Sequence, residues 1–347
     1  MANRLLKQVV GIDVAQKELV VSLGRMDENA VSVIYAGKAF LNNEKGFASM
    51  ESWVNKQTFT AYPLRYVMEA TGVYHEKAAY YLSNKKYDVS IVKPNRISGF
   101  FRTLELKTIT DKSMSQAIAM FGLEKKLDNW VQPKRVYRSL RQLTREREQL
   151  IAERTVIKNQ LHAEQAEAFP GEDTIRRMKD RIKIINVQLK EVMVEIRTAI
   201  KRDAELKKTI DTITTIPGIG LLTATIVLAE TNGFELIQNK RQLTSYAGLD
   251  IKEKESGTSV KGKPRISKQG NKYLRKAMYL PALAAIKYSE RYKAVFIRIV
   301  SRNSVKMKGV IAVGRKLLEM VYTIYKTGKP YQMDYLQKQA ELSPLNS

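Results

Sequence analysis

The sequence predicts an α/β N-terminal part, a helical hairpin in the middle and a mainly α-helical, basic C-terminal part. Short apolar strands alternate with helical patterns up to about residue 125, which is typical of a sheet covered by helices. Residues 134–208 contain no Pro or Gly except Pro170 and Gly171, which separate two long helical patterns. From residue 209 onward the patterns are again helical, and Lys and Arg outnumber Asp and Glu.

The N-terminal part contains strand and helix patterns in alternation. The predicted strands span residues 9–14, 19–23, 31–35, 64–68 and 89–92, and helices are predicted near 45–54 and 73–82. Strands that alternate with helices predict a mixed or parallel sheet with helices packed on it. We therefore expect the carboxyl ends of neighbouring parallel strands to meet at one edge of this sheet.

Acidic residues stand where the predicted strands end. Asp13 closes the first strand, Glu69 closes the fourth, and Asp111 lies at a predicted helix start. Converging carboxylates repel one another unless a cation lies between them. The chain has no Cys and two His, so carboxylates would have to hold such an ion, which favours Mg²⁺. The alternative is that these acids are turn and helix-cap residues.

The middle segment predicts a coiled-coil hairpin. In its second arm, apolar residues recur at alternating spacings of four and three: Met178, Ile182, Ile185, Leu189, Val192 and Ile196. In its first arm the repeat is weaker and consists of Leu143, Leu150 and Ile157. Arg147 and Arg154 occupy the other seam position there. Packing of the two arms on each other and contact between two chains both fit this pattern.

The composition points to a polyanionic partner. There are 60 Lys and Arg against 35 Asp and Glu, a formal net charge of +25, and such an excess favours nucleic acid over a membrane surface. The longest uncharged stretch, residues 212–229, is interrupted by Pro and Gly, so we expect neither a membrane span nor an exported protein. The absence of Cys excludes disulfides, zinc ribbons, iron–sulfur clusters and thiol catalysis.

Two segments of the C-terminal part carry patterns that favour contact with a phosphate backbone. Residues 215–220 predict a helix-hairpin-helix-like turn, and residues 255–268 form a loop rich in Gly, hydroxyl and basic side chains. The predicted nucleic-acid-binding residues are Gly218, Gly220, Lys261, Lys263, Arg265, Lys268, Asn271 and Arg275. The alternatives are a tight helix–helix corner without a ligand and a solvated basic face.

Several of these motifs, taken in chain order, resemble one protein family. They are Gly-Ile-Asp13-Val, Met-Glu69-Ala-Thr-Gly, Ile-Pro-Gly218-Ile-Gly220, Ser256-Gly257 and Gly270-Asn271-Lys-Tyr-Leu-Arg275. Together they resemble the transposases of the insertion sequence 110 family, the Piv-like DEDD-type recombinases, from about residue 8 to 330. The resemblance implies an RNase H-like (RuvC-like) domain at 1–125, a coiled-coil hairpin at 134–208, a helical serine-containing domain at 209–330 and a loose tail at 331–347.

The resemblance also implies chemistry and partners. The chain would be a site-specific DNA recombinase of a bacterial insertion sequence, located in the cytoplasm. Asp13, Glu69 and Asp111 would bind Mg²⁺, and Ser256 would attack DNA and form a covalent link with it. A structured bridge RNA would pair with donor and target DNA, and the protein would act as a homodimer or homotetramer.

The chain departs from the family pattern at the fourth acid. The family reads Thr-Asp-x-x-Asp-Ala, whereas this chain reads Thr110-Asp111-Lys112-Ser113-Met114-Ser115, which places Met, a poor Mg²⁺ ligand, where the last Asp is expected. Three explanations stay open: three acids suffice, Ser113 or Ser115 assists, or this chain is impaired. Two other functions also stay open, a RuvC-like Mg²⁺-dependent junction nuclease and a catalytically impaired nucleic-acid-binding derivative.

Overall fold

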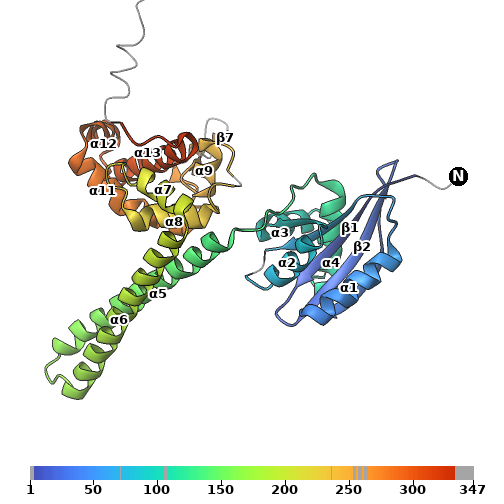
Figure 1. The fold of residues 1–347 in the computed structure, drawn as a ribbon, viewed down its shortest axis with the longest axis horizontal. Coiled ribbons are helices and arrows are strands. Elements are labelled where there is room, and N and C mark those ends of the chain that lie inside the picture. Colours follow the sequence, from blue (N-terminus) through green and yellow to red (C-terminus); the bar gives the residue numbers. More distant parts are fainter. Residues whose placement is uncertain are drawn as a thin grey trace, which may run out of the picture. The chain divides into compact units, whose positions relative to one another are not determined.

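The computed structural model describes most of residues 4–332. Within that range it leaves out Thr71, residues 105–107, Leu236, residues 253–254, 257–259 and 262–264, and it gives the backbone alone for Glu255, Ser256, Val260, Lys261 and Asn303. The chain forms two compact units, Met1–Gln132 and Pro133–Ser347, both drawn in Figure 1. The finer domain boundaries expected from the sequence stay predictions.

The first unit is built on a five-stranded sheet with the strand order β3-β2-β1-β4-β5. The strands are β1 (Leu5–Val14), β2 (Glu18–Asp27), β3 (Ser32–Leu41), β4 (Leu64–Glu69) and β5 (Asp88–Val92). The pairs β1–β2 and β2–β3 are antiparallel, whereas β1–β4 and β4–β5 are parallel. The predicted strands are confirmed, but the first three were predicted too short. Polar positions such as Arg25 and Lys38 stay in these strands because their side chains project into solvent.

Helices cover both faces of this sheet. They are α1 (Glu44–Gln57), α2 (Glu76–Asn84), α3 (Pro94–Phe101) and α4 (Asp111–Glu124). Val10 belongs to a hydrophobic cluster with residues of α1 and α2, whereas Val9 belongs to a second cluster with residues of α3 and α4. Neighbouring residues join different clusters because successive side chains of a strand point to opposite faces. The predicted mixed α/β fold of the N-terminal part is confirmed.

The second unit is helical. Its helices are α5 (Arg135–Gln165), α6 (Glu172–Arg202), α7 (Ala204–Ile213), α8 (Leu221–Thr231), α9 (Lys240–Tyr246), α10 (Lys272–Ala277), α11 (Tyr279–Tyr288), α12 (Glu290–Asn303) and α13 (Lys306–Thr327). Two-residue strands pair as β6 (Ile251–Lys252) with β9 (Arg265–Ile266), and β7 (Glu255–Ser256) with β8 (Val260–Lys261). The predicted long hairpin and mainly helical C-terminal part are confirmed.

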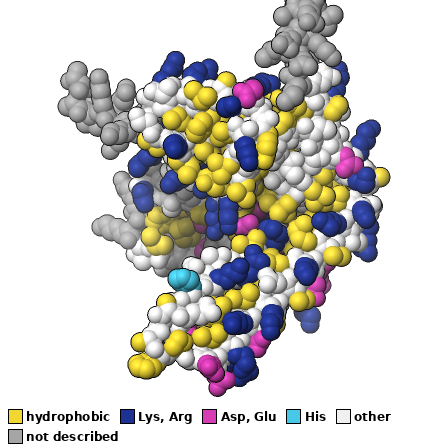
Figure 2. Space-filling view, turned by 90° about the vertical axis from the view of Figure 1, so that its left-hand side faces the viewer, with side chains coloured by type: hydrophobic (Ala, Val, Ile, Leu, Met, Phe, Trp, Pro, Cys, Tyr) yellow, Lys and Arg dark blue, Asp and Glu magenta, His cyan; other side chains and the backbone are white. Residues whose placement is uncertain are grey.

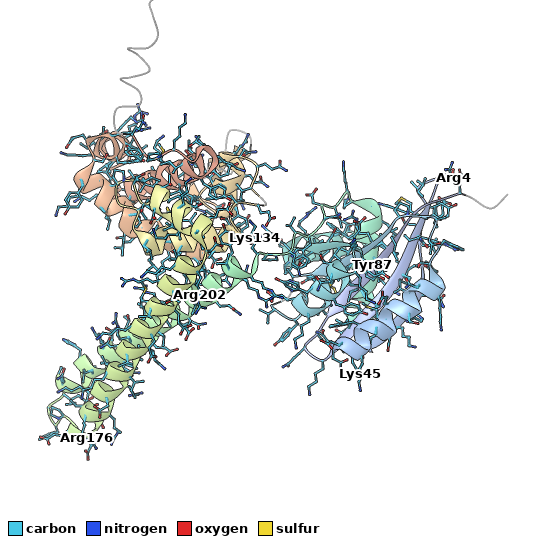
Figure 3. The ribbon with its side chains drawn as sticks, viewed as in Figure 1. Arg4, Lys45, Tyr87, Lys134, Arg176 and Arg202 are labelled. Carbon is cyan, nitrogen blue, oxygen red and sulfur yellow. The ribbon has the colours of Figure 1, made fainter. Side chains whose placement is uncertain are left out.

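Helices α5 and α6 form the hairpin, whose turn lies beside Arg176 and whose base lies beside Arg202 (Figure 3). Ile185, Val192 and Ile196 of the predicted seam are buried, and they belong to the same hydrophobic cluster as Leu150 of α5. The seam is therefore used for packing within the chain. None of the helices in the described part of the chain combines the length and apolar composition that a membrane crossing requires.

Candidate active site and nucleic-acid-binding segments

The carboxylate of Asp13 lies at the end of β1, beside the end of β4. In the parallel register Ile12 pairs with Met68, so Asp13 and Glu69 follow at the same level on neighbouring strands. Burial, together with the charges of Asp111 and Glu69, raises the pKa of Asp13 to about 6. The structure thus places Asp13 within the electrostatic influence of the other two predicted acids, although all three are far apart in the sequence.

Helix α4 brings Asp111 to this site because it packs directly on β1. A Cβ atom added to Gly11 would lie 2.3 Å from the backbone nitrogen of Ala119 and 2.4 Å from the carbonyl oxygen of Ser115. On α4, a Cβ atom added to Gly122 would lie 2.7 Å from a methyl group of Val9. At Gly11 the strand therefore meets the backbone of the helix, and at Gly122 the helix meets side chains of the sheet, so both positions leave little room for a side chain.

A capping box fixes the start of α4. The hydroxyl oxygen of Thr110 accepts a hydrogen bond from the Ser113 backbone N–H at 3.1 Å, and the Ser113 hydroxyl accepts one from the Thr110 backbone N–H at 2.8 Å. This reciprocal pair satisfies two backbone donors that the helix itself leaves open. Asp111 is the first residue of the helix and is exposed, so its carboxylate is free to face the other acids.

The residues around the missing fourth acid are occupied in packing and hydrogen bonding. Met114 is half-buried and packs against the hydrophobic cluster formed with α3. The Ser115 hydroxyl is fully buried, lies 2.8 Å from the Ser22 hydroxyl and donates to the Lys112 carbonyl oxygen. The hydroxyls of Ser113 and Ser115 therefore both have partners within the first unit, and this favours the explanation that three acids suffice.

The three acids do not form a closed ligand set. Among the residues that the structure describes, no group of three or more Asp, Glu or His side chains is arranged to hold one metal ion. The donor set consists of carboxylate oxygens alone, which are the ligands that Mg²⁺ prefers. The raised pKa of Asp13 fits a site for a divalent cation. The side chains of Asp13, Glu69 and Asp111 would have to move closer together to bind one.

The two glycines of the predicted phosphate-binding turn have different surroundings. Gly218 has φ +87° and a Cβ atom there would lie 2.6 Å from the carbonyl oxygen of Pro281 on α11. This close approach within the unit accounts for glycine at this position without a ligand. Gly220 precedes α8 and has open space where a Cβ atom would stand. Its role as a nucleic-acid contact stays a prediction.

Asn271 and Arg275, also predicted to bind nucleic acid, make hydrogen bonds within the second unit. The Asn271 side-chain oxygen caps α10, accepting from the backbone N–H groups of Tyr273 and Leu274 at 2.9 and 3.2 Å. The guanidinium of Arg275 donates to the Ala247 carbonyl oxygen at 2.8 Å. These contacts give both side chains a part in holding the loop before α10.

The remaining predicted residues lie in or near the basic loop. Ser256 ends β7, where it pairs with Val260 of β8, and its side chain lies outside the described residues. Lys261 is in β8 with its side chain likewise outside, and Lys263 lies outside altogether. Arg265 in β9 and Lys268 are exposed. The catalytic role of Ser256 and the binding roles of the four basic residues stay predictions.

An ion pair with a buried carboxylate was missed by the sequence reasoning. Glu230, at the end of α8, is 3% exposed and accepts two hydrogen bonds from Arg145, both of 2.8 Å. The Asn271 amide donates to the same carboxylate at 2.6 Å. A carboxylate at the end of an apolar helix signals a hidden partner, but this partner lies 85 residues away.

Comparison with known proteins agrees with these features. The profile described as "Transposase IS116/IS110/IS902 family" matches residues 210–296, and a second transposase profile, of the DEDD type, matches residues 10–170. The pilin gene-inverting protein of Moraxella bovis is 30% identical over 300 residues, which are 84% of this chain and 89% of that protein, and the Moraxella lacunata protein gives the same values. An uncharacterized 43.6 kDa insertion element IS110 protein of Streptomyces coelicolor is 27% identical over 120 residues, 35% of this chain and 29% of that protein.

Among solved structures, Thermus thermophilus RuvC in complex with a Holliday junction substrate aligns with 35% of this chain and 99% of its own, with 9% identity and a TM-score of 0.28. So weak a structural likeness adds no argument of its own. The identity to the Moraxella proteins over most of both chains is sufficient, and two transposase profiles match separate parts of the sequence. The chain therefore belongs to the IS110/IS116/IS902 family of transposases, and its N-terminal part matches the DEDD-type transposase profile of that family.

Proposed function

We propose that this transposase cuts and rejoins DNA with Ser256 as the nucleophile and with Asp13, Glu69 and Asp111 as ligands of Mg²⁺. The carrying observation is the electrostatic strain at Asp13, whose pKa is raised to about 6 by burial and by the charges of Asp111 and Glu69. A divalent cation between the three carboxylates would relieve this repulsion. When bound, it would also offset the negative charge that develops on a scissile phosphate.

The chemistry assigned to the serine is a transesterification. The Ser256 oxygen attacks phosphorus, the bond from phosphorus to one deoxyribose oxygen breaks, and that oxygen leaves as a hydroxyl after taking up a proton. Because the phosphodiester is exchanged for a phosphoserine, a hydroxyl of another strand can reverse the attack and rejoin DNA without an external energy source. A serine hydroxyl is a weak nucleophile at its ordinary pKa and needs a base or a charged neighbour.

The experiment traps the covalent intermediate. Wild-type protein incubated with Mg²⁺ and its element's DNA, then denatured, should run as a protein–DNA adduct, and Ser256→Ala should lose the adduct while still binding DNA. Ser259→Ala in the same loop is the matched control and should keep it. An adduct that persists in Ser256→Ala would overturn the nucleophile. Cleaved DNA without attached protein would instead support a junction nuclease that uses water.

We further propose that a structured bridge RNA and a second copy of the chain take part. The support is membership of this family together with the net charge of +25, which favours polyanionic partners. A defined RNA should co-purify with the protein, and DNA cutting should stop after ribonuclease treatment and return when that RNA is added back. Cutting that continues after complete removal of RNA would contradict the RNA proposal. Light scattering should give the mass of a dimer or tetramer.

A further inference from the structure

The two arginines that interrupt the seam of α5 border a groove along the hairpin. Arg147 and Arg154 are seven residues apart and so lie on one face of the helix. With α6 they line a groove of about 620 Å³. Its lining also includes Ile151, Leu189 and the cations Lys190 and Arg197. At both seam positions the groove therefore has a cation where a coiled coil would have an apolar side chain.

The groove is basic, and its charge is not a general property of the hairpin. It is lined by four Lys and Arg side chains and by no acid among the described residues. A second groove of about 650 Å³ between the same two helices has Glu153 and Arg181 as its charged residues and is otherwise mostly apolar. On the face seen in Figure 2, Asp and Glu side chains also occur on the hairpin, so a lining without acids is particular to this groove.

The guanidinium groups in this groove have unused donors. Arg154 donates one hydrogen bond of 2.8 Å to the side-chain oxygen of Asn186. The Nε of Arg147 is buried and has no hydrogen-bond partner within the described structure. A buried donor without a partner is unfavourable, and an anion that accepts its hydrogen bond removes the penalty. A guanidinium fork matches a phosphate group in geometry and charge.

A second cavity adjoins the groove toward α8, α10 and α11. It measures about 400 Å³ and shares Arg147 and Ile151 with the groove. Its two acids are already neutralised, since Glu148 pairs with Lys276 and Glu230 pairs with Arg145. No uncompensated carboxylate in the described lining would therefore repel an anion that enters from the hairpin side.

We propose that this groove of the hairpin binds the sugar–phosphate backbone of DNA. DNA is the anion that the transposase family implies as substrate. Four cations lie along one groove with no ion pair to a described carboxylate, and such a row suits successive phosphates better than a single small anion. The proposal rests on the proposed function only in assuming a DNA substrate. In this proposal the groove supplies affinity for DNA and takes no part in strand cleavage. An experiment can therefore contradict DNA binding by the groove without contradicting the assignment of Ser256 as nucleophile, and the reverse.

The decisive variant is Arg147→Leu with Arg154→Leu in the full-length protein. Leucine restores an apolar seam, so the melting temperature should stay the same or rise, while DNA affinity at about 0.1 M salt should fall at least about tenfold. The slope of log K against log salt concentration should become shallower by about two, because two phosphate contacts are lost. The amount of covalent adduct at saturating DNA should not change.

Three further variants complete the test. Arg181→Leu in the second groove should leave affinity and slope unchanged, and Ser256→Ala should lose the adduct but keep both. Arg147→Lys with Arg154→Lys keeps the charge and should keep the slope while losing some affinity. Unchanged DNA affinity in the double leucine variant would overturn the proposal. So would a loss confined to RNA binding, or a change of oligomeric state with DNA affinity intact.

Discussion

At the scale of single residues, the main feature is the carboxyl group of Asp13, which lies where its negative charge is unfavourable. Asp13 is half-buried and faces two other acids, and its pKa is raised to about 6. Between about pH 4 and 6 the folded protein therefore binds more protons at Asp13 than the unfolded chain does. This contribution to stability is present at low pH and is lost as the pH rises through 6. Such strain is what a site for a cation requires.

Asp13→Asn should therefore raise the melting temperature of metal-free protein at pH 7.5 by a few degrees. The gain should shrink at pH 4.5, where the wild-type carboxyl is largely protonated. Burial lowers the pKa of His75, and this makes the stability of the folded protein rise with pH, opposite to the effect of Asp13. The melting temperatures of wild type and variant are therefore compared with each other at each pH. Mg²⁺ should stabilise the wild type and not the variant. Glu18→Gln, at an exposed position of the same sheet, should show neither effect.

At the scale of elements, the site depends on one contact between a strand and a helix. The backbone of α4 lies against Gly11 of β1, and the capping box at Thr110 begins the helix with Asp111 foremost. Any side chain at position 11 would meet backbone atoms of Ala119 and Ser115 that cannot rotate away. Because Gly11 has no side chain, α4 can lie against β1, and this packing sets the position of Asp111 relative to Asp13.

Gly11→Ala should destabilise the first unit by about 1–3 kcal/mol or more, as overpacking does, and should abolish DNA cutting because α4 moves away from Asp13. Chemical denaturation followed by far-UV circular dichroism measures the first effect. Gly99→Ala is the matched control, because a Cβ atom there meets nothing within 4 Å and alanine favours the helix. Equal stability of the Gly11 variant and the wild type would contradict this view of the contact.

At the scale of the whole molecule, two units carry separate hydrophobic cores. Within the described residues, one cluster lies wholly in the second unit and the other two lie wholly in the first. The second unit also contains the ion pair between the buried Glu230 and the partly exposed Arg145. Removing one partner of such a pair leaves hydrogen-bonding groups unsatisfied. Stability and function can therefore be perturbed in one unit at a time.

Calorimetry should show two unfolding transitions. Gly11→Ala should lower one, and Glu230→Gln should lower the other by several degrees, in line with about 1–3 kcal/mol for a buried hydrogen-bonded group. Glu290→Gln breaks an exposed pair with Lys293 and should change little. A single transition lowered equally by both variants would show that the units unfold together.

Much of the fold was readable from local patterns. Short apolar runs located the five strands, and the heptad repeat with Pro170 and Gly171 located the hairpin. Both signals are carried by residues that are close together in the sequence. The lengths of β2 and β3 were not readable, since their polar ends resemble turns until the partner strands are known. The acids were found for the same local reason, as each one directly follows an apolar strand or precedes a helix.

By itself the sequence determined the order of elements, the excess of positive charge and the family to which the chain belongs. Only the tertiary structure showed that Gly11 must be glycine, that Asn271 and Arg275 hold a loop, and that the seam arginines line a groove. These features depend on contacts between residues tens of positions apart, as in Glu230 and Arg145, which are separated by 85 residues. A pattern of near neighbours contains no information about such distances, because folding alone brings the partners together.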